Sequence, residues 1–168
     1  MTCTECLWIL AQLAAGWFVA DLVSGVYHFL VDNYGSPSTP IFGRQIMEFR
    51  RHHDDPQECV RDFSIWSYFV LPVMGGIALG LLLFPVGGPV VGVAGGLGIA
   101  AVQYSHRAAH VLAPGRTWRM LQWLRITLNT AHHSRHHMSG KEAYASLCGW
   151  SNPLLDRLLP SGRRKAAL

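Results

Sequence analysis

Charged side chains are scarce in this chain: they make up 14% of its 168 residues, whereas hydrophobic side chains make up 50%. So few charges together with so many apolar residues exclude an intrinsically disordered chain. The same composition disfavours an ordinary soluble enzyme. The length fits a single domain, residues 1–168, and a membrane is its expected environment.

Cysteine is sparse as well, and its four residues, Cys3, Cys6, Cys59 and Cys148, form no disulfide framework. Cys3 and Cys6 make one CxxC pair, but without a second pair this spacing is only a weak zinc motif. The net charge is +4, yet no basic stripe interleaved with aromatic residues is present, so we expect no nucleic-acid partner. No basic residue precedes the first apolar stretch, so no cleaved signal peptide is expected.

The longest uncharged run extends from Phe63 to Ser105. It is too long for one transmembrane helix, because about 20 residues cross the hydrocarbon core of a bilayer. The residues PVGGP at 85–89 divide it, since proline and glycine interrupt helices. We therefore expect two spans, residues 64–84 and 89–111. The apolar stretch over residues 7–32 is long enough to form a third span.

Basic residues indicate how these three spans lie in the membrane. All 14 lysines and arginines lie in segments that the spans place on one side, whereas the N-terminal tail and the 85–89 turn contain none. Positive charge marks the cytoplasmic side, so we expect the N-terminus outside and the other polar segments inside. Residues 116–130 mix tryptophan and leucine with arginine, and we expect an interfacial helix there.

The chain holds nine histidines, and this topology places all of them near the cytoplasmic membrane surface. His106 and His110 are four residues apart and share a helix face, and residues 132–137 contain two more pairs at this spacing. Neutral imidazole binds zinc, copper, iron or nickel, and nine rings exceed what one ion needs. The pattern predicts an all-α integral membrane protein whose cytoplasmic histidine-rich cap holds two metal ions. The candidate ligands are His28, His52, His53, His106, His110, His132, His133, His136 and His137.

Two carboxylates accompany the first of these histidines. Asp21, His28 and Asp32 are separated by seven and four residues, so they share one helix face. A carboxylate in an apolar span is costly and usually faces a partner or a cavity. The spacing therefore predicts a polar stripe toward the cytoplasmic end of this span. Neither the Glu-x-x-His pairs of soluble di-iron bundles nor the H-E-x-x-H motif of zinc proteases occurs.

The histidines lie within a set of longer motifs that covers residues 21–158. The segments are DLVSGVYHFLVDNYG at 21–35, TPIFG at 39–43, FRRHHDDP at 49–56, QYSHRAAH at 103–110, LQ at 121–122, HHSRHH at 132–137 and GWSN at 149–152. This set resembles the lipid desaturase family, which includes plasmanylethanolamine desaturases of the Kua type and plant chloroplast desaturases of phosphatidylglycerol. Residues 124–127 depart from the Kua type, which carries a further histidine near this position.

The resemblance implies a membrane di-iron enzyme that uses O₂ to introduce a C=C bond near a phospholipid head group. The implied substrate is a plasmanyl ether lipid or a phospholipid acyl chain near its carboxyl, and the sequence leaves both open. Two electrons would come from an external donor of the ferredoxin or cytochrome b5 type, because no Rossmann, haem or ferredoxin motif is present. The implied location is the plasma membrane of a bacterium, or the endoplasmic reticulum or chloroplast membrane of a eukaryote.

The resemblance also assigns roles to individual residues. Eight histidines would be iron ligands, namely His28, His52, His53, His106, His110, His133, His136 and His137. His132 is a less constant member of the motif. Asp32 would orient a ligand ring, a role that metal-bound histidines usually require. Four arginines, Arg44, Arg50, Arg51 and Arg107, are placed to hold a lipid phosphate or to serve as cytoplasmic-side charges.

Two other functions fit parts of the histidine pattern. A membrane metal-binding or metal-transport protein also concentrates imidazole, but its ligands should continue through the membrane midplane. A haem-binding electron carrier needs paired histidines on facing helices at matched depth. The gathering of all nine histidines at one membrane surface favours the oxidase over both.

Overall fold

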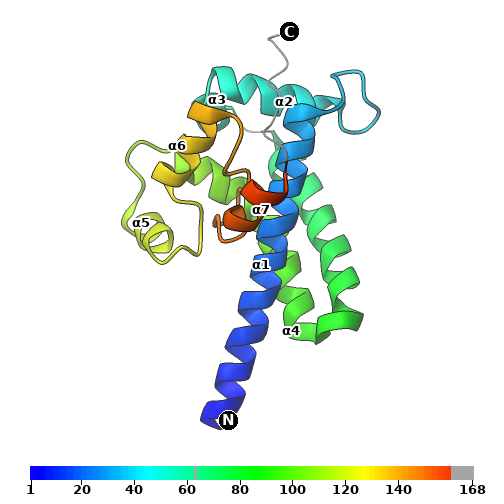
Figure 1. The fold of residues 1–168 in the computed structure, drawn as a ribbon, viewed down its shortest axis with the longest axis vertical. Helices are drawn as coiled ribbons and strands as arrows, with labels where there is room; N and C mark the ends of the chain where they lie inside the picture. Colours follow the sequence, from blue (N-terminus) through cyan, green and yellow to red (C-terminus); the bar gives the residue numbers. More distant parts are fainter. Residues whose placement is uncertain (63, 160–168) are drawn as a thin grey trace.

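The computed structural model describes residues 1–62 and 64–159, and every regular element within them is helical (Figure 1). The elements are α1 (Cys3–Asn33), α2 (Gly43–Asp54), α3 (Glu58–Arg61), the π-helix η1 (Trp66–Val70), α4 (Leu71–His110), α5 (Arg116–Trp123), α6 (Thr130–Ser139) and α7 (Asn152–Leu158). The all-α class expected from the sequence is confirmed.

Helix α1 begins at a capping box. The Thr2 hydroxyl accepts a hydrogen bond from the Glu5 backbone N–H, and the Glu5 carboxylate accepts one from the Thr2 N–H, which satisfies donors that a helix start leaves open. The first half of α1 is exposed, with Leu7 at 62% and Trp8 at 66%, and burial begins only at Gly16. The N-terminal half of α1 therefore projects away from the rest of the chain (Figure 1).

Helix α4 folds back on itself at Gly88. This residue has φ 79° and ψ −178°, a conformation that glycine adopts without a steric penalty. The two halves then run antiparallel and in close contact, since a Cβ on Gly76 would lie 2.5 Å from the Gly96 carbonyl oxygen and one on Gly80 would lie 3.1 Å from that of Gly92. Small residues permit this approach, as in membrane helix pairs. The bend falls within the turn expected at 85–89.

Two stretches are long and apolar enough to cross a membrane, Cys3–Asn33 and Trp66–His110. Their most apolar windows are only 17% and 11% buried within the protein. A core helix of a soluble protein hides its apolar face from water, so this exposure indicates that the surroundings of both stretches are themselves apolar. The second stretch contains both antiparallel halves of α4.

Glycines hold α1 against α4. A Cβ on buried Gly16 would lie 2.4 Å from the Val91 carbonyl oxygen and 2.8 Å from the Ala94 side chain, and one on Gly98 would lie 2.5 Å from the Ala20 side chain. The backbones of the two helices therefore touch directly, without side chains between them. This contact holds the middle of α1 against the C-terminal half of α4.

We expect Gly16→Leu to separate α1 from α4 and to cost at least about 1–3 kcal/mol, as overpacking of a tight contact does. The midpoint of thermal unfolding of the purified protein in detergent should fall accordingly. Ala15→Leu is the matched control, because Ala15 is the adjacent residue and is exposed. Equal unfolding midpoints for the two variants would contradict this helix contact.

The interfacial helix predicted at 116–130 is shorter in the structure. Helix α5 ends at Trp123, and Arg125 then adopts the left-handed conformation with φ 54°. The residues that follow are used in packing: Leu128 is fully buried, and its N–H donates to the Ser105 hydroxyl at 2.8 Å. Tertiary contacts thus override the helical pattern after Trp123.

Candidate metal centre

Eight histidines and Asp32 gather where the ends of α1, α2, α4 and α6 meet. Their side chains form two groups, and within each group the potential ligand atoms all lie within 4.8 Å of one another. The five-histidine group contains His52, His106, His110, His133 and His137. The Asp32 group contains His28, Asp32, His53 and His136.

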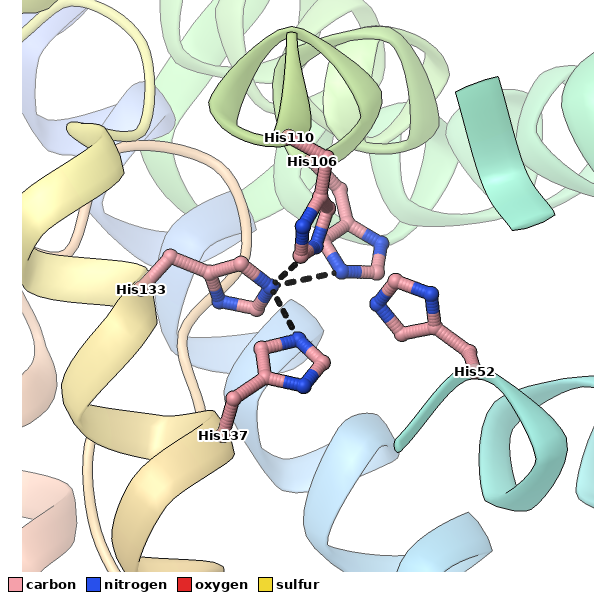
Figure 2. Close-up of side chains that lie close together, drawn as sticks. All are labelled: His52, His106, His110, His133 and His137. Carbon is pink, nitrogen blue, oxygen red and sulfur yellow. Dashed lines mark hydrogen bonds between the residues drawn. The ribbon is translucent and has the colours of Figure 1, made fainter. Parts of the chain in front are cut away.

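The five-histidine group is centred on His133. Its Nε2 lies 2.8 Å from Nε2 of both His106 and His110, and 3.1 Å from Nε2 of His137. The His52 ring completes the group with its centroid 4.5 Å from that of His110. Figure 2 shows that the rings belong to different helices and face one shared space. Converging imidazole nitrogens are the arrangement that a bound transition-metal ion requires.

In the Asp32 group one carboxylate oxygen faces three rings. Asp32 Oδ2 lies 3.4 Å from His28 Nε2, 3.0 Å from His53 Nε2 and 3.4 Å from His136 Nε2. Asp32 follows His28 by one turn of α1, while His53 lies in the last turn of α2 and His136 belongs to α6. The structure therefore places Asp32 among the ring nitrogens themselves.

Several buried polar atoms of both groups lack a hydrogen-bond partner among the described residues. They include His28 Nε2, Asp32 Oδ1 and both ring nitrogens of His52. Buried polar atoms in proteins almost always have a partner. An imidazole or carboxylate atom aimed into such a group fits a metal ion as the partner, and the donor set of nitrogen and oxygen atoms suits iron.

Electrostatics keep the rings in the form that binds metal. Burial, and then the neighbouring histidines, lower the pKa of His52 and of His137 far below the ordinary value for histidine. The same causes lower the pKa of His133. All three rings are neutral at physiological pH, and a neutral imidazole offers its nitrogen lone pair to a metal.

A loop segment orients two rings of the Asp32 group. His28 Nδ1 donates to the Tyr144 carbonyl oxygen at 2.9 Å and faces the Ser146 hydroxyl at 3.0 Å. His136 Nδ1 donates to the Glu142 carbonyl oxygen at 2.8 Å. With Nδ1 engaged as the donor, Nε2 of each ring presents its lone pair to the group.

His132 lies outside both groups. Its Nε2 lies 2.6 Å from the Asn152 side-chain amide nitrogen, and its Nδ1 lies 2.7 Å from the Arg135 guanidinium nitrogen. Among the nine candidate histidines, the structure thus brings eight together with Asp32 and places His132 beside them. Asn152 belongs to the GWSN motif, but nothing in its sequence pattern indicated this contact.

An apolar cavity of about 440 Å³ reaches the histidines from the membrane-spanning side. It lies between α1 and the two halves of α4, and its walls include Val23, Leu71 and Ala78. Its lining also includes His28 and His106. The lining therefore joins apolar side chains of the long helices to one ring of each ligand group.

A polar cavity of about 240 Å³ adjoins the apolar one. Both are lined by Gln45, Phe49, Ser67, Gln103 and His106. The Ser67 hydroxyl donates to the Glu48 carboxylate at 2.5 Å and accepts from the Gln45 side-chain amide at 2.9 Å. Sequence reasoning did not single out Gln45, Ser67 or Gln103. Their signal was weak, since Ser67 and Gln103 are ordinary uncharged polar residues in a long apolar run.

The four arginines considered for phosphate binding separate into two pairs. Arg44 and Arg51 line the polar cavity, paired with Glu48 and Glu58 respectively. Arg50 and Arg107 instead hold backbone carbonyl oxygens, those of Tyr34 and Val60, at 3.0 Å and 2.7 Å. Of the four arginines, only Arg44 and Arg51 therefore line this cavity.

Residues 17–159 match the family model described as the lipid desaturase domain. The chain belongs to this family. Over 153 residues it is 29% identical to the plasmanylethanolamine desaturase of Myxococcus xanthus, an alignment that covers 86% of this chain and 54% of that protein. Two chloroplastic proteins of Arabidopsis thaliana match shorter parts. Fatty acid desaturase 4-like 1 is 44% identical over 80 residues, which cover 46% of this chain and 27% of that protein.

The second Arabidopsis protein, fatty acid desaturase 4, is 53% identical over 47 residues, which cover 28% of this chain and 15% of that protein. This lipid desaturase family member thus spans about half the length, 54%, of its Myxococcus relative and less of the plant ones. No solved structure matches the chain.

Proposed function

We propose that this protein is a membrane di-iron lipid desaturase, which uses O₂ and two external electrons to form a C=C bond near a phospholipid head group. The observation that carries the proposal is the pair of ligand groups beside an apolar cavity. Each group has enough nitrogen and oxygen atoms to hold one iron ion. Membership of the lipid desaturase family supports the same chemistry.

We propose that the five-histidine group and the Asp32 group are the ligands of the two iron ions. His133 and its four partners would hold one iron ion, and His28, His53, His136 and Asp32 would hold the other. When bound, the iron pair supplies the oxidising power for removing hydrogen from an alkyl chain, which no side-chain acid or base has. The protein's own residues orient the rings, bury them and exclude water around them.

The proposed topology has three spans, α1 and the two halves of α4. The bend at Gly88 supports this count, because it returns the C-terminal half of α4 to the side from which the other half began. Figure 1 shows the N-terminus at the end of α1 far from α2 and α6, so the N-terminus and the ligand groups would lie on opposite sides of the membrane. Since basic residues follow the first span, the ligand groups would face the cytoplasm.

The lipid would bind across the junction of the two cavities. Its alkyl chain would occupy the apolar cavity and its head group the polar one, where a phosphate would compete with Glu48 and Glu58 for Arg44 and Arg51. His106 lines both cavities, so the carbons next to the junction would lie beside the ligand groups. For this reason we propose that the C=C bond forms near the head group.

A plasmanyl ether lipid is the first proposed substrate, because the similarity to the Myxococcus plasmanylethanolamine desaturase covers 86% of the chain. A phospholipid acyl chain is the second, because identity to the Arabidopsis fatty acid desaturases is higher, at 44% and 53%, over shorter stretches. The electrons would come from a separate protein of the ferredoxin or cytochrome b5 type.

The proposal is tested by expressing the chain in cells that lack such an enzyme and analysing their lipids by mass spectrometry. We expect one lipid class to lose two hydrogens, with acid-labile vinyl ethers formed if the ether substrate is correct. The purified protein should contain two iron ions per chain. Zinc alone, together with an unchanged lipid profile, would instead favour the metal-binding or transport function.

A further inference from the structure

Asp21 is a fully buried carboxylate within α1, away from both ligand groups. Its Oδ1 accepts hydrogen bonds from the backbone N–H of Cys148 at 2.8 Å and of Gly149 at 3.0 Å. Its Oδ2 accepts from the Ser151 N–H at 2.8 Å and from the Ser151 hydroxyl at 2.7 Å. Four donors to one carboxylate offset the cost of placing its charge in an apolar span. Asp21 is therefore an anchor for the chain around residue 150.

The anchored segment, residues 142–152, is buried and hydrogen-bonded along most of its length. Its residues from Ala143 to Cys148 are buried, although none of them belongs to a helix. Further hydrogen bonds tie it to the spans, since the Ser146 N–H donates to the Ser24 hydroxyl at 3.1 Å and the Ser105 hydroxyl donates to the Leu147 carbonyl oxygen at 2.5 Å. A non-helical segment depends on such contacts for its backbone position.

Two carbonyl oxygens of this segment orient rings of the Asp32 group. The carbonyl oxygens of Glu142 and Tyr144 hold Nδ1 of His136 and of His28, and both rings belong to the Asp32 group. In the five-histidine group, Nδ1 of His52 and of His133 has no hydrogen-bond partner among the described residues. The two metal positions therefore differ in how their ligands are oriented.

We propose that Asp21 is a positioning residue for the metal ion of the Asp32 group. By fixing the 142–152 segment from inside the membrane span, it sets the two carbonyl oxygens that orient His28 and His136. The inference rests on the proposed two-metal centre. Losing such an indirect support typically weakens metal affinity about 10–100-fold.

The test is a cobalt(II) titration of the purified full-length protein in lipid nanodiscs, followed by the visible absorption of bound Co²⁺. We expect the unmodified protein to bind two ions. Asp21→Asn places an amide NH₂ against backbone N–H donors, so one ion should bind about 10–100-fold more weakly while the other keeps its affinity. Asp156→Asn is the matched control: Asp156 is exposed and accepts one bond from the Ala143 N–H, which an asparagine oxygen also accepts. This control should bind both ions as the unmodified protein does.

Each result of the titration either supports or overturns the role proposed for Asp21. Unchanged affinity for both ions in folded Asp21→Asn, or equal weakening of both, would overturn the proposal. If Asp21→Asn does not fold, Ser146→Ala removes only the hydroxyl that faces His28 Nδ1, and it should weaken the same single ion. An unaffected titration of Ser146→Ala would then overturn the role of the segment. Fewer than two ions in the unmodified protein would refute the two-metal centre itself, a different result from either of these.

Discussion

Replacing His133 with alanine is expected to reduce lipid desaturation by at least about a hundredfold, whereas the same change at the adjacent His132 should leave clear activity. His133 Nε2 is within 3.1 Å of three other ring nitrogens, so its loss opens the centre of the five-histidine group. Losing an indirect support of a ligand already costs about 10–100-fold in affinity or activity, and losing the ligand itself costs more. His132 contacts Asn152 and Arg135 instead.

The measurement combines the lipid profile with the iron content of both variants after purification. His133→Ala should bind fewer than two iron ions per chain and remain inserted in the membrane. His132→Ala should retain both ions, with a smaller effect on turnover through its contact with Asn152. Full desaturation by His133→Ala would remove the five-histidine group from the reaction. If His132→Ala lost iron while His133→Ala retained it, His132 would have to be counted as a ligand.

Helical periodicity was enough to predict the local part of the centre. A four-residue spacing places His106 beside His110, and the structure brings both to one group. Periodicity also placed His28 and Asp32 on one face, where they now share a group. These relations depend only on the geometry of a single helix, which the sequence determines directly.

What the sequence did not show depends on contacts between distant segments. Asp21 shares the helix face of His28, yet its partners are backbone N–H groups more than a hundred residues away, at 148–151. His132 and His133 are adjacent in the motif, but successive side chains of a helix point in different directions. The two rings therefore face different neighbours. The early end of α5 has the same origin, because Leu128 gains more from burial than from continuing a helix.

The arrangement explains how a small chain brings two groups of potential metal ligands together. The spans contribute glycine contacts that bring α1 and α4 together, and the same helices carry His28, Asp32, His106 and His110 at their ends. Two short helices, α2 and α6, contribute the remaining histidines of the two groups. Stability of the helix bundle and geometry of the centre therefore depend on the same contacts.

Filling the apolar cavity should block desaturation without disturbing the metal centre. Ala78 lines this cavity on the first half of α4, at a distance along the chain from every candidate ligand. In Ala78→Phe the added ring occupies space that the alkyl chain of the lipid would need. A displaced chain moves the reacting carbons away from the two groups, and displacement by about 1 Å is enough for a loss of tenfold or more.

We expect Ala78→Phe to bind two iron ions, as the unmodified protein should, and to lose about tenfold or more of its desaturation rate on long-chain lipids. Lipids with shorter chains should be affected less, because they reach less far into the cavity. Ile77→Phe is the matched control: it adds a similar ring on the same helix at the adjacent residue, which is 56% exposed and does not line the cavity. Equal rates for the two variants, measured in nanodiscs with a defined lipid series, would show that the alkyl chain reaches the histidines by another route.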